Sequence, residues 1–182
     1  MDELSLYVLD ITMNSVRAGA DTIHVTLTED DETLCLNVRD NGCGMSREQL
    51  QRLRDPFFTT RKTRKVGLGI PFLSMLAEMT GGSVHVSSVP QSESEQHGTD
   101  VVATFGKTHI DCIPLGDMVS TFTTLIQGSP DIHFIFTHKT LRGTVALDTD
   151  ELHSILGDLS LAEPEILQWI GGHLREQYEA IK

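Results

Sequence analysis

Residues 40–45 read "DNGCGM", an aspartate followed by two glycines at alternate positions. The run before it, residues 33–39, alternates apolar and polar side chains, which predicts a β-strand that ends at Asp40. A carboxylate at the end of a strand can be held rigidly toward a pocket, and Gly42 and Gly44 leave room for a planar ring near the backbone. The same six residues are also typical of a plain Asp-Asn-Gly turn, so the rest of the chain must decide between the two.

A second polar cluster lies in "LDITMNSVRAGA", residues 9–20. Residues 4–18 carry apolar side chains near a 3.6-residue period and are predicted to be helical. On a helix Asp10 and Asn14 share one face, and Arg17 falls near it. A carboxylate, an amide oxygen and a guanidinium together suit a hydrated Mg²⁺ and a polyphosphate. A solvated helix face is the alternative interpretation.

Basic residues and glycines are concentrated in "RKTRKVGLGI", residues 61–70. The formal net charge is -12, yet eight of the 14 Lys and Arg residues lie between Arg39 and Lys65. Gly67 and Gly69 precede a predicted helix, whose free N-terminal N–H groups favour an anion. Their spacing matches neither the P-loop nor the dinucleotide fingerprint. Because the positive charge is local, a small anionic ligand is favoured over a nucleic-acid backbone.

The remaining pattern predicts a mixed sheet with helices on one face. Four strands and three helices are expected up to Lys107, and an amphipathic helix, two strands and two further helices follow it. We therefore expect two parts, a domain at residues 1–107 and a small C-terminal α/β extension of unknown role at residues 108–182.

In chain order, "NSVRAGA", "DNGCGM", "DPFFTT" with "GLGI", and "GTDVVATF" resemble the N, G1, F/G2 and G3 boxes of the GHKL superfamily. That superfamily groups the ATP-binding domains of type II topoisomerases, a heat-shock chaperone, histidine kinases and mismatch-repair proteins of the MutL type. The resemblance covers about residues 4–106. It implies the Bergerat ATP-binding fold, an α+β two-layer sandwich, with ATP and Mg²⁺ as cofactors.

The resemblance also implies roles for single residues. Asp40 matches the aspartate that accepts a hydrogen bond from the adenine amino group, and Thr99 matches the threonine that assists on the same edge. Asn14 matches the asparagine that holds Mg²⁺ against the phosphates, and Asp10 stands where hydrolysing members carry a water-activating glutamate. The other nucleotide-binding positions implied are Arg17, Gly42, Gly44, Met45, Lys62, Lys65, Gly67, Leu68, Gly69 and Ile70.

The sequence departs from each branch of the superfamily. Aspartate is shorter than glutamate, so the reach of Asp10 to an attacking water is reduced. Because a general base raises the reaction rate about 10²–10⁴-fold, the effectiveness of Asp10 decides between a true ATPase and a slow one. Three residues precede the first predicted helix, where histidine kinases carry a dimerisation helix with the phosphoacceptor His, so we expect no autophosphorylation in the usual arrangement. The last 75 residues are short for a transducer domain and hold two lysines, Lys139 and Lys182.

We therefore expect a cytoplasmic Mg-ATP-binding protein that hydrolyses ATP slowly or acts as a stand-alone kinase on a separate protein. A non-catalytic nucleotide-sensing module is the alternative. The expected partners are ATP or ADP and a protein, with a homodimer as one arrangement. Nucleic acid is not expected because the chain is acidic, and a membrane is not expected because no apolar run approaches the roughly 18 residues of a span.

Overall fold

The computed structural model describes residues 3–53 and 69–182. Within these ranges six strands form one mixed sheet in the order β3-β4-β2-β1-β5-β6. The elements are α1 (Leu4–Arg17), β1 (Thr22–Glu29), β2 (Thr33–Asp40), α2 (Arg47–Leu53), α3 (Gly69–Met79), β3 (Ser83–Val89), β4 (Gly98–Gly106), α4 (Met118–Gly128), β5 (His133–Thr140), β6 (Gly143–Asp148), α5 (Thr149–Leu156) and α6 (Pro164–Ala180).

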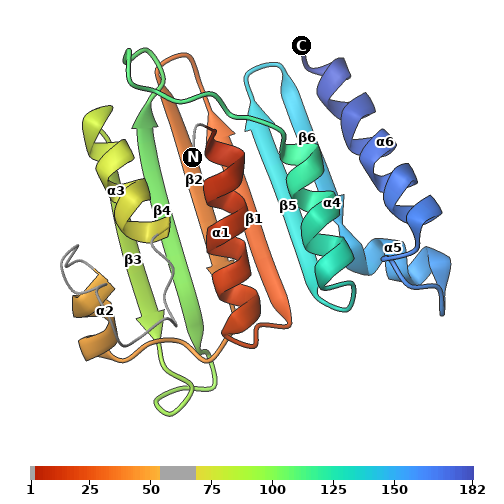
Figure 1. Ribbon diagram of the computed structural model, residues 1–182, viewed down its shortest axis with the longest axis horizontal. Coiled ribbons are helices and arrows are strands. Elements are labelled where there is room, and N and C mark those ends of the chain that lie inside the picture. The colour runs from red at the N-terminus through yellow and green to blue at the C-terminus, as the bar shows by residue number, and fades with distance from the viewer. Residues whose placement is uncertain (1–2, 54–68) are drawn as a thin grey trace.

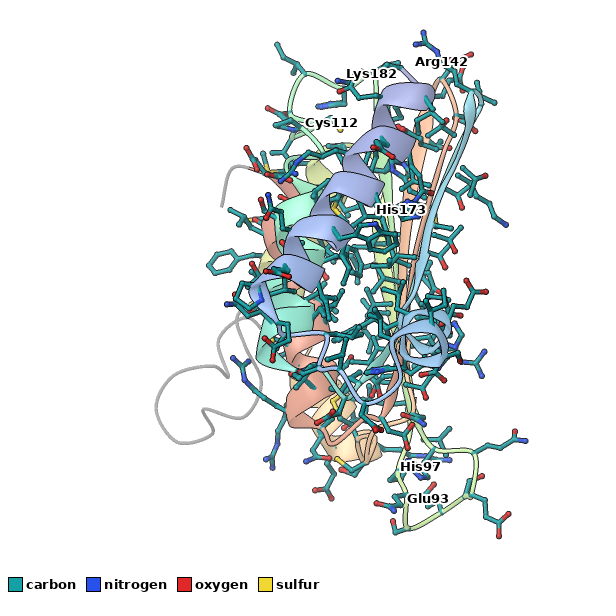
Figure 2. The ribbon with its side chains drawn as sticks, turned by 90° about the vertical axis from the view of Figure 1, so that its right-hand side faces the viewer. Glu93, His97, Cys112, Arg142, His173 and Lys182 are labelled. Atoms are coloured by element: carbon teal, nitrogen blue, oxygen red, sulfur yellow. The ribbon has the colours of Figure 1, made fainter. Side chains whose placement is uncertain are left out.

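Helices α3, α1, α4 and α6 lie side by side over one face of this sheet (Figure 1). Seen from the side, the helices and the strands form two separate layers (Figure 2). The apolar side chains of the strands and helices meet between the layers, where Val25, Leu36 and Phe136 are almost fully buried. The predicted α+β two-layer sandwich is therefore confirmed.

The β1–β2 hairpin forms the centre of the sheet. It positions the turn at residues 40–45, which is called the Asp40 turn below. The two strands pair antiparallel from Glu29 opposite Leu34 to Ile23 opposite Asp40. The turn that follows β2 is joined to the end of α1 by a hydrogen bond from the Cys43 N–H to the carbonyl oxygen of Ala18, at 2.9 Å. The ends of α1 and β2 are therefore held together at one end of the molecule.

The C-terminal part continues this sheet. β5 pairs parallel with β1, from Thr22 opposite His133 to Thr28 opposite Lys139. α4 packs beside α1, and the ring of Phe122 on α4 stacks on Phe136 of β5 with 4.1 Å between ring centres. One sheet and one core thus extend through the described residues on both sides of Lys107, while the predicted division into two parts stays a prediction.

The β5–β6 connection is shorter than the sequence pattern predicts. The run "HKTLR" reads as a loop, but its first three residues belong to β5, and the turn is only Leu141 and Arg142. The polar His138 continues the strand because it is buried and has polar partners on neighbouring elements.

No helix in the described part of the chain is long and apolar enough to span a bilayer.

Candidate functional site

Asp40 is the centre of the candidate site. It ends β2 with only 9% of its surface exposed. One carboxylate oxygen accepts a hydrogen bond from the Ser15 hydroxyl at 2.5 Å. The other accepts from the backbone N–H groups of Gly42 at 2.9 Å and Thr99 at 3.2 Å. A buried carboxylate is costly without donors, and these three, from three different elements, hold it in one orientation.

A cavity of about 490 Å³ opens beside this carboxylate. Its wall contains seven of the predicted site residues, namely Asn14, Arg17, Asp40, Gly44, Met45, Ile70 and Thr99. It also contains residues that the sequence analysis did not assign to the site, namely Ile11, Ser15, Ala18, Cys43, Gln49 and Val101. An apolar concave wall with a few fixed polar groups is typical of a small-molecule site.

The glycines of the turn after β2 are fixed by packing against the chain itself. Gly44 has φ +67, and a Cβ there would lie 2.0 Å from the carbonyl oxygen of Val89. A Cβ on Gly42 would lie 2.9 Å from the Cβ of Ala18. The turn therefore presses against β3 on one side and the end of α1 on the other.

The side chain of Asn41 anchors the same turn to the start of β1. Its oxygen accepts from the backbone N–H groups of Asp21 and Thr22 at 3.1 and 3.0 Å. Its NH₂ group donates to the Asp21 carboxylate at 2.6 Å. This hydrogen bond is the main cause that lowers the pKa of Asp21. The Asn of "DNG" thus has a structural role.

The hydroxyl groups of Ser88 and Thr99 form hydrogen bonds next to the cavity wall. The Ser88 hydroxyl oxygen lies 2.9 Å from the hydroxyl oxygen of Thr99. It accepts from the backbone N–H of Met45 at 2.8 Å and donates to the carbonyl oxygen of Gly98 at 2.9 Å. Sequence reasoning missed Ser88 because its only link to Thr99 is the cross-strand register between β3 and β4.

The loop between β3 and β4 also touches the turn. His97 lies 2.5 Å through its Nδ1 from the carbonyl oxygen of Gly42. In Figure 2, His97 and Glu93 mark this loop at one end of the molecule, while Arg142 and Lys182 mark the opposite end. The Asp40 turn is therefore in contact with α1, β3 and this loop.

Asn14 and Arg17 contact each other in the cavity wall. The Arg17 Nη1 donates to the Asn14 amide oxygen at 3.1 Å. The Asn14 Nδ2 is buried and has no hydrogen-bond partner among the described residues. A buried amide nitrogen without a partner is uncommon, so within the described residues this donor is available to a polar group in the cavity.

Asp10 lies next to the first residue of α3. A Cβ on Gly69 would lie 2.0 Å from the Asp10 Oδ2, so the carboxylate touches the N-terminus of that helix, where negative charge is favoured. Neither residue forms part of the cavity wall. Four predicted positions, Lys62, Lys65, Gly67 and Leu68, lie outside the described residues.

A family model described as "Histidine kinase-, DNA gyrase B-, and HSP90-like ATPase" matches residues 2–109. The chain belongs to this family, and the matched part is an ATP-binding domain of the GHKL type.

Among curated proteins, the chain is similar to Sporulation kinase B of Bacillus subtilis (strain 168), with 31% identity over 102 residues, which are 54% of this chain and 22% of that protein. It is also similar to the sensor histidine kinase ZraS of Escherichia coli O157:H7, with 31% identity over 90 residues, 48% of this chain and 19% of that protein. The chain thus covers about a fifth of each of these relatives.

Among solved structures, the fold is similar to the Aquifex aeolicus MutL ATPase domain complexed with ADP, with a TM-score of 0.56 and 13% identity, covering 86% of this chain and 69% of that one. The N-terminal domain of a DNA repair protein matches with a TM-score of 0.55 and 18% identity, covering 81% of this chain and 53% of the other. Residues 2–109 alone cannot supply such coverage, so the likeness of fold extends into the C-terminal part.

Proposed function

We propose that this protein binds Mg-ATP in the Asp40 cavity and either hydrolyses it slowly or transfers its γ-phosphoryl group to a separate protein partner. The observation that carries the proposal is the buried Asp40 carboxylate, held by three donors in the wall of a cavity. The 6-amino group of adenine brings hydrogen-bond donors, which a carboxylate accepts. A buried acceptor rejects ligands that bring no donor, because it would then be desolvated without compensation.

The triphosphate would lie toward Asn14 and Arg17. Arg17 offers a cation that suits phosphate oxygens. The Asn14 amide oxygen is the kind of hard ligand that Mg²⁺ prefers, and the unpartnered Nδ2 of the same side chain fits a polar ligand beside it. Mg²⁺ bound there would neutralise phosphate charge. Residues 61–70, where the sequence concentrates basic residues and glycines, would supply further cations and backbone N–H groups to the phosphates.

Asp10 is the proposed general base for hydrolysis. The contact between its carboxylate and Gly69 supports this proposal, because Gly69 belongs to the segment predicted to meet the phosphates. The position of Asp10 also favours a second candidate function, a nucleotide-sensing module without turnover. Its carboxylate lies against the N-terminus of α3 and outside the cavity wall.

Calorimetric titration of Mg-ATP into the wild type and Asp40→Asn tests the binding proposal. We expect the substitution to weaken ATP binding by about ten- to hundredfold, since a hydrogen bond to a charged group contributes about 1.5–3 kcal/mol. Asp100→Asn is the matched control, because Asp100 adjoins Thr99 on β4 while its carboxylate accepts from Asn37. Equal ATP affinity in the wild type and Asp40→Asn would mean that adenine does not bind there.

Three assays separate the possible uses of ATP. Multiple-turnover phosphate release that is lost in Asp10→Asn indicates a hydrolase. Radiolabel that moves from [γ-³²P]ATP to a protein, with little free phosphate, indicates a kinase. Tight binding with neither activity indicates a sensor.

A further inference from the structure

Ser88 contacts residues of the cavity wall but does not line the cavity itself. The residue lies on β3 directly opposite Thr99 on β4. Thr99 belongs to the wall and Ser88 does not. Any effect of Ser88 on a ligand must therefore pass through Thr99 or through the backbone that Ser88 contacts.

The hydrogen atoms at Ser88 determine the direction of its contact with Thr99. A serine hydroxyl has one hydrogen to donate and two lone pairs that accept. One lone pair accepts from the backbone N–H of Met45 at 2.8 Å. The carbonyl oxygen of Gly98, at 2.9 Å, can only accept, so the single hydrogen goes there. The Thr99 hydroxyl at 2.9 Å must then donate to the second lone pair.

The opposite direction makes fewer hydrogen bonds. If Ser88 donated to Thr99, the Gly98 carbonyl would lose its side-chain donor, and the Thr99 hydrogen would turn elsewhere. With Thr99 as the donor, Ser88 makes all three hydrogen bonds that its single hydroxyl allows. The hydroxyl hydrogen of Thr99 is then used in the bond to Ser88. The Thr99 oxygen can therefore act toward a ligand only as an acceptor, through its lone pairs.

We propose that Ser88 is a positioning residue that holds Thr99 as a hydrogen-bond acceptor, so that the cavity selects a 6-aminopurine over a 6-oxopurine. Asp40 is an acceptor in the same wall, and acceptors that face position 6 of a purine favour an amino group there over an oxygen. Adenine presents an amino group at position 6, whereas a 6-oxopurine presents an acceptor oxygen there. The inference rests on the proposed binding of ATP in this cavity.

The test compares the dissociation constants of ATP and inosine triphosphate, which carries an oxygen in place of the 6-amino group. In Ser88→Ala the Thr99 hydroxyl is free to turn and donate to that oxygen. We expect the preference for ATP over inosine triphosphate to fall about three- to tenfold, the value of one hydrogen bond. Loss of the contacts to Met45 and Gly98 would weaken the binding of both nucleotides alike. It would leave the preference for ATP over inosine triphosphate unchanged.

Four further variants make the test specific, namely Ser83→Ala, Ser88→Thr, Thr99→Val and the double variant Thr99→Val with Ser88→Ala. Ser83→Ala removes a similar serine from the other end of β3, where Ser83 lies 3.4 Å from the Thr104 hydroxyl, and is expected to keep the preference. Ser88→Thr retains the hydroxyl and is expected to keep it as well. In a Thr99→Val background, Ser88→Ala should have no further effect on the preference, because no hydroxyl remains to reorient.

Four outcomes decide the proposal. An unchanged preference in Ser88→Ala, or the same fall with and without the Thr99 hydroxyl, would overturn it. If Ser88→Ala does not fold, as measured by thermal unfolding, Ser88→Cys replaces it, since the thiol fills the space of the hydroxyl but is only a weak hydrogen-bonding group. A lower preference for ATP in Ser88→Ala, together with the wild-type preference in Ser88→Thr, would support the proposal. Wild-type protein that binds no ATP would instead overturn the proposed function on which the inference rests.

Discussion

Gly44 shows how strongly one residue of the Asp40 turn is constrained. Its φ of +67 is a left-handed conformation, and the space where a Cβ would stand is taken by the Val89 carbonyl. The left-handed conformation alone costs a residue with a Cβ roughly 1–2 kcal/mol. The lack of space adds to this, because the backbone of β3 would have to move.

We predict that Gly44→Ala lowers the free energy of unfolding by the 1–2 kcal/mol of conformational cost and by roughly a further 1–3 kcal/mol from overpacking. Urea unfolding measures both terms together. Gly19→Ala is the matched control, because Gly19 has φ +74 but no atom within 4 Å of a built Cβ. If the two variants lose the same stability, the contact with Val89 has no energetic consequence.

At the scale of elements, α6 is joined to the sheet by a partly buried set of polar side chains around His138. His138 on β5 is 1% exposed. Its Nδ1 lies 3.0 Å from the Tyr178 hydroxyl oxygen of α6, and its Nε2 lies 3.2 Å from a Glu29 carboxylate oxygen on β1, which is ion-pair distance without hydrogen-bond geometry. The other oxygen of Glu29 pairs with Lys107 at 2.8 Å. Three elements of the sheet and helix layers therefore share one network, beside a second cavity of about 370 Å³.

We predict that this network makes folding stability depend on pH. Burial lowers the pKa of His138 below 6.5, although Glu29 acts to raise it. Between the folded and unfolded pKa values the unfolded chain binds more protons, so stability rises with pH there. The contribution is complete above about pH 6.5 and is lost as the pH falls through the folded pKa.

Urea unfolding from pH 5 to 8 should therefore show a shallower fall in stability at low pH for His138→Gln than for the wild type. His85→Gln, at an exposed histidine of β3, is the control and should keep the wild-type slope. Identical slopes in all three proteins would contradict the prediction.

At the scale of the whole molecule, the C-terminal part covers a central strand. β1 has β2 on one side and β5 on the other. The backbone N–H groups of Leu4 and Ser5 also bond to the carbonyl oxygens of Pro114 and Leu115, at 2.9 and 2.8 Å. Removal of residues 108–182 would leave β1 as an unpaired edge, which is a site for aggregation.

We predict that a chain ending at Lys107 aggregates or unfolds at a markedly lower temperature than the full chain. Size-exclusion chromatography and thermal unfolding by circular dichroism measure the two outcomes. A monomeric fragment with the melting temperature of the full chain would show instead that the N-terminal part is stable by itself.

Most elements could be predicted from the sequence, because alternation and helical periodicity are local properties. The helix at 4–18 and the strand at 33–39 agree with α1 and β2 within a residue. The cap of α2 is likewise a local feature, since the Ser46 N–H bonds to the Gln49 side chain at 2.8 Å and the Gln49 N–H to the Ser46 hydroxyl at 3.3 Å.

The candidate site could be predicted only in part. Asp40, Asn14 and Thr99 stand in ordered motifs, and the structure brings them into one cavity wall. Ser15 and Ser88 carry no such signal, because a serine acquires a role here only through the oxygen it faces across the fold.

Periodicity, capping and glycine spacing are read within short windows, so the sequence alone predicts most elements, the four GHKL boxes in their order and the α+β class. The three-dimensional fold was needed to show that β5 and β6 continue the same sheet, and that Ser15, Ser88 and His97 surround the Asp40 turn. The physical reason is that these contacts depend on strand order and register between residues distant in the chain, which no local pattern encodes.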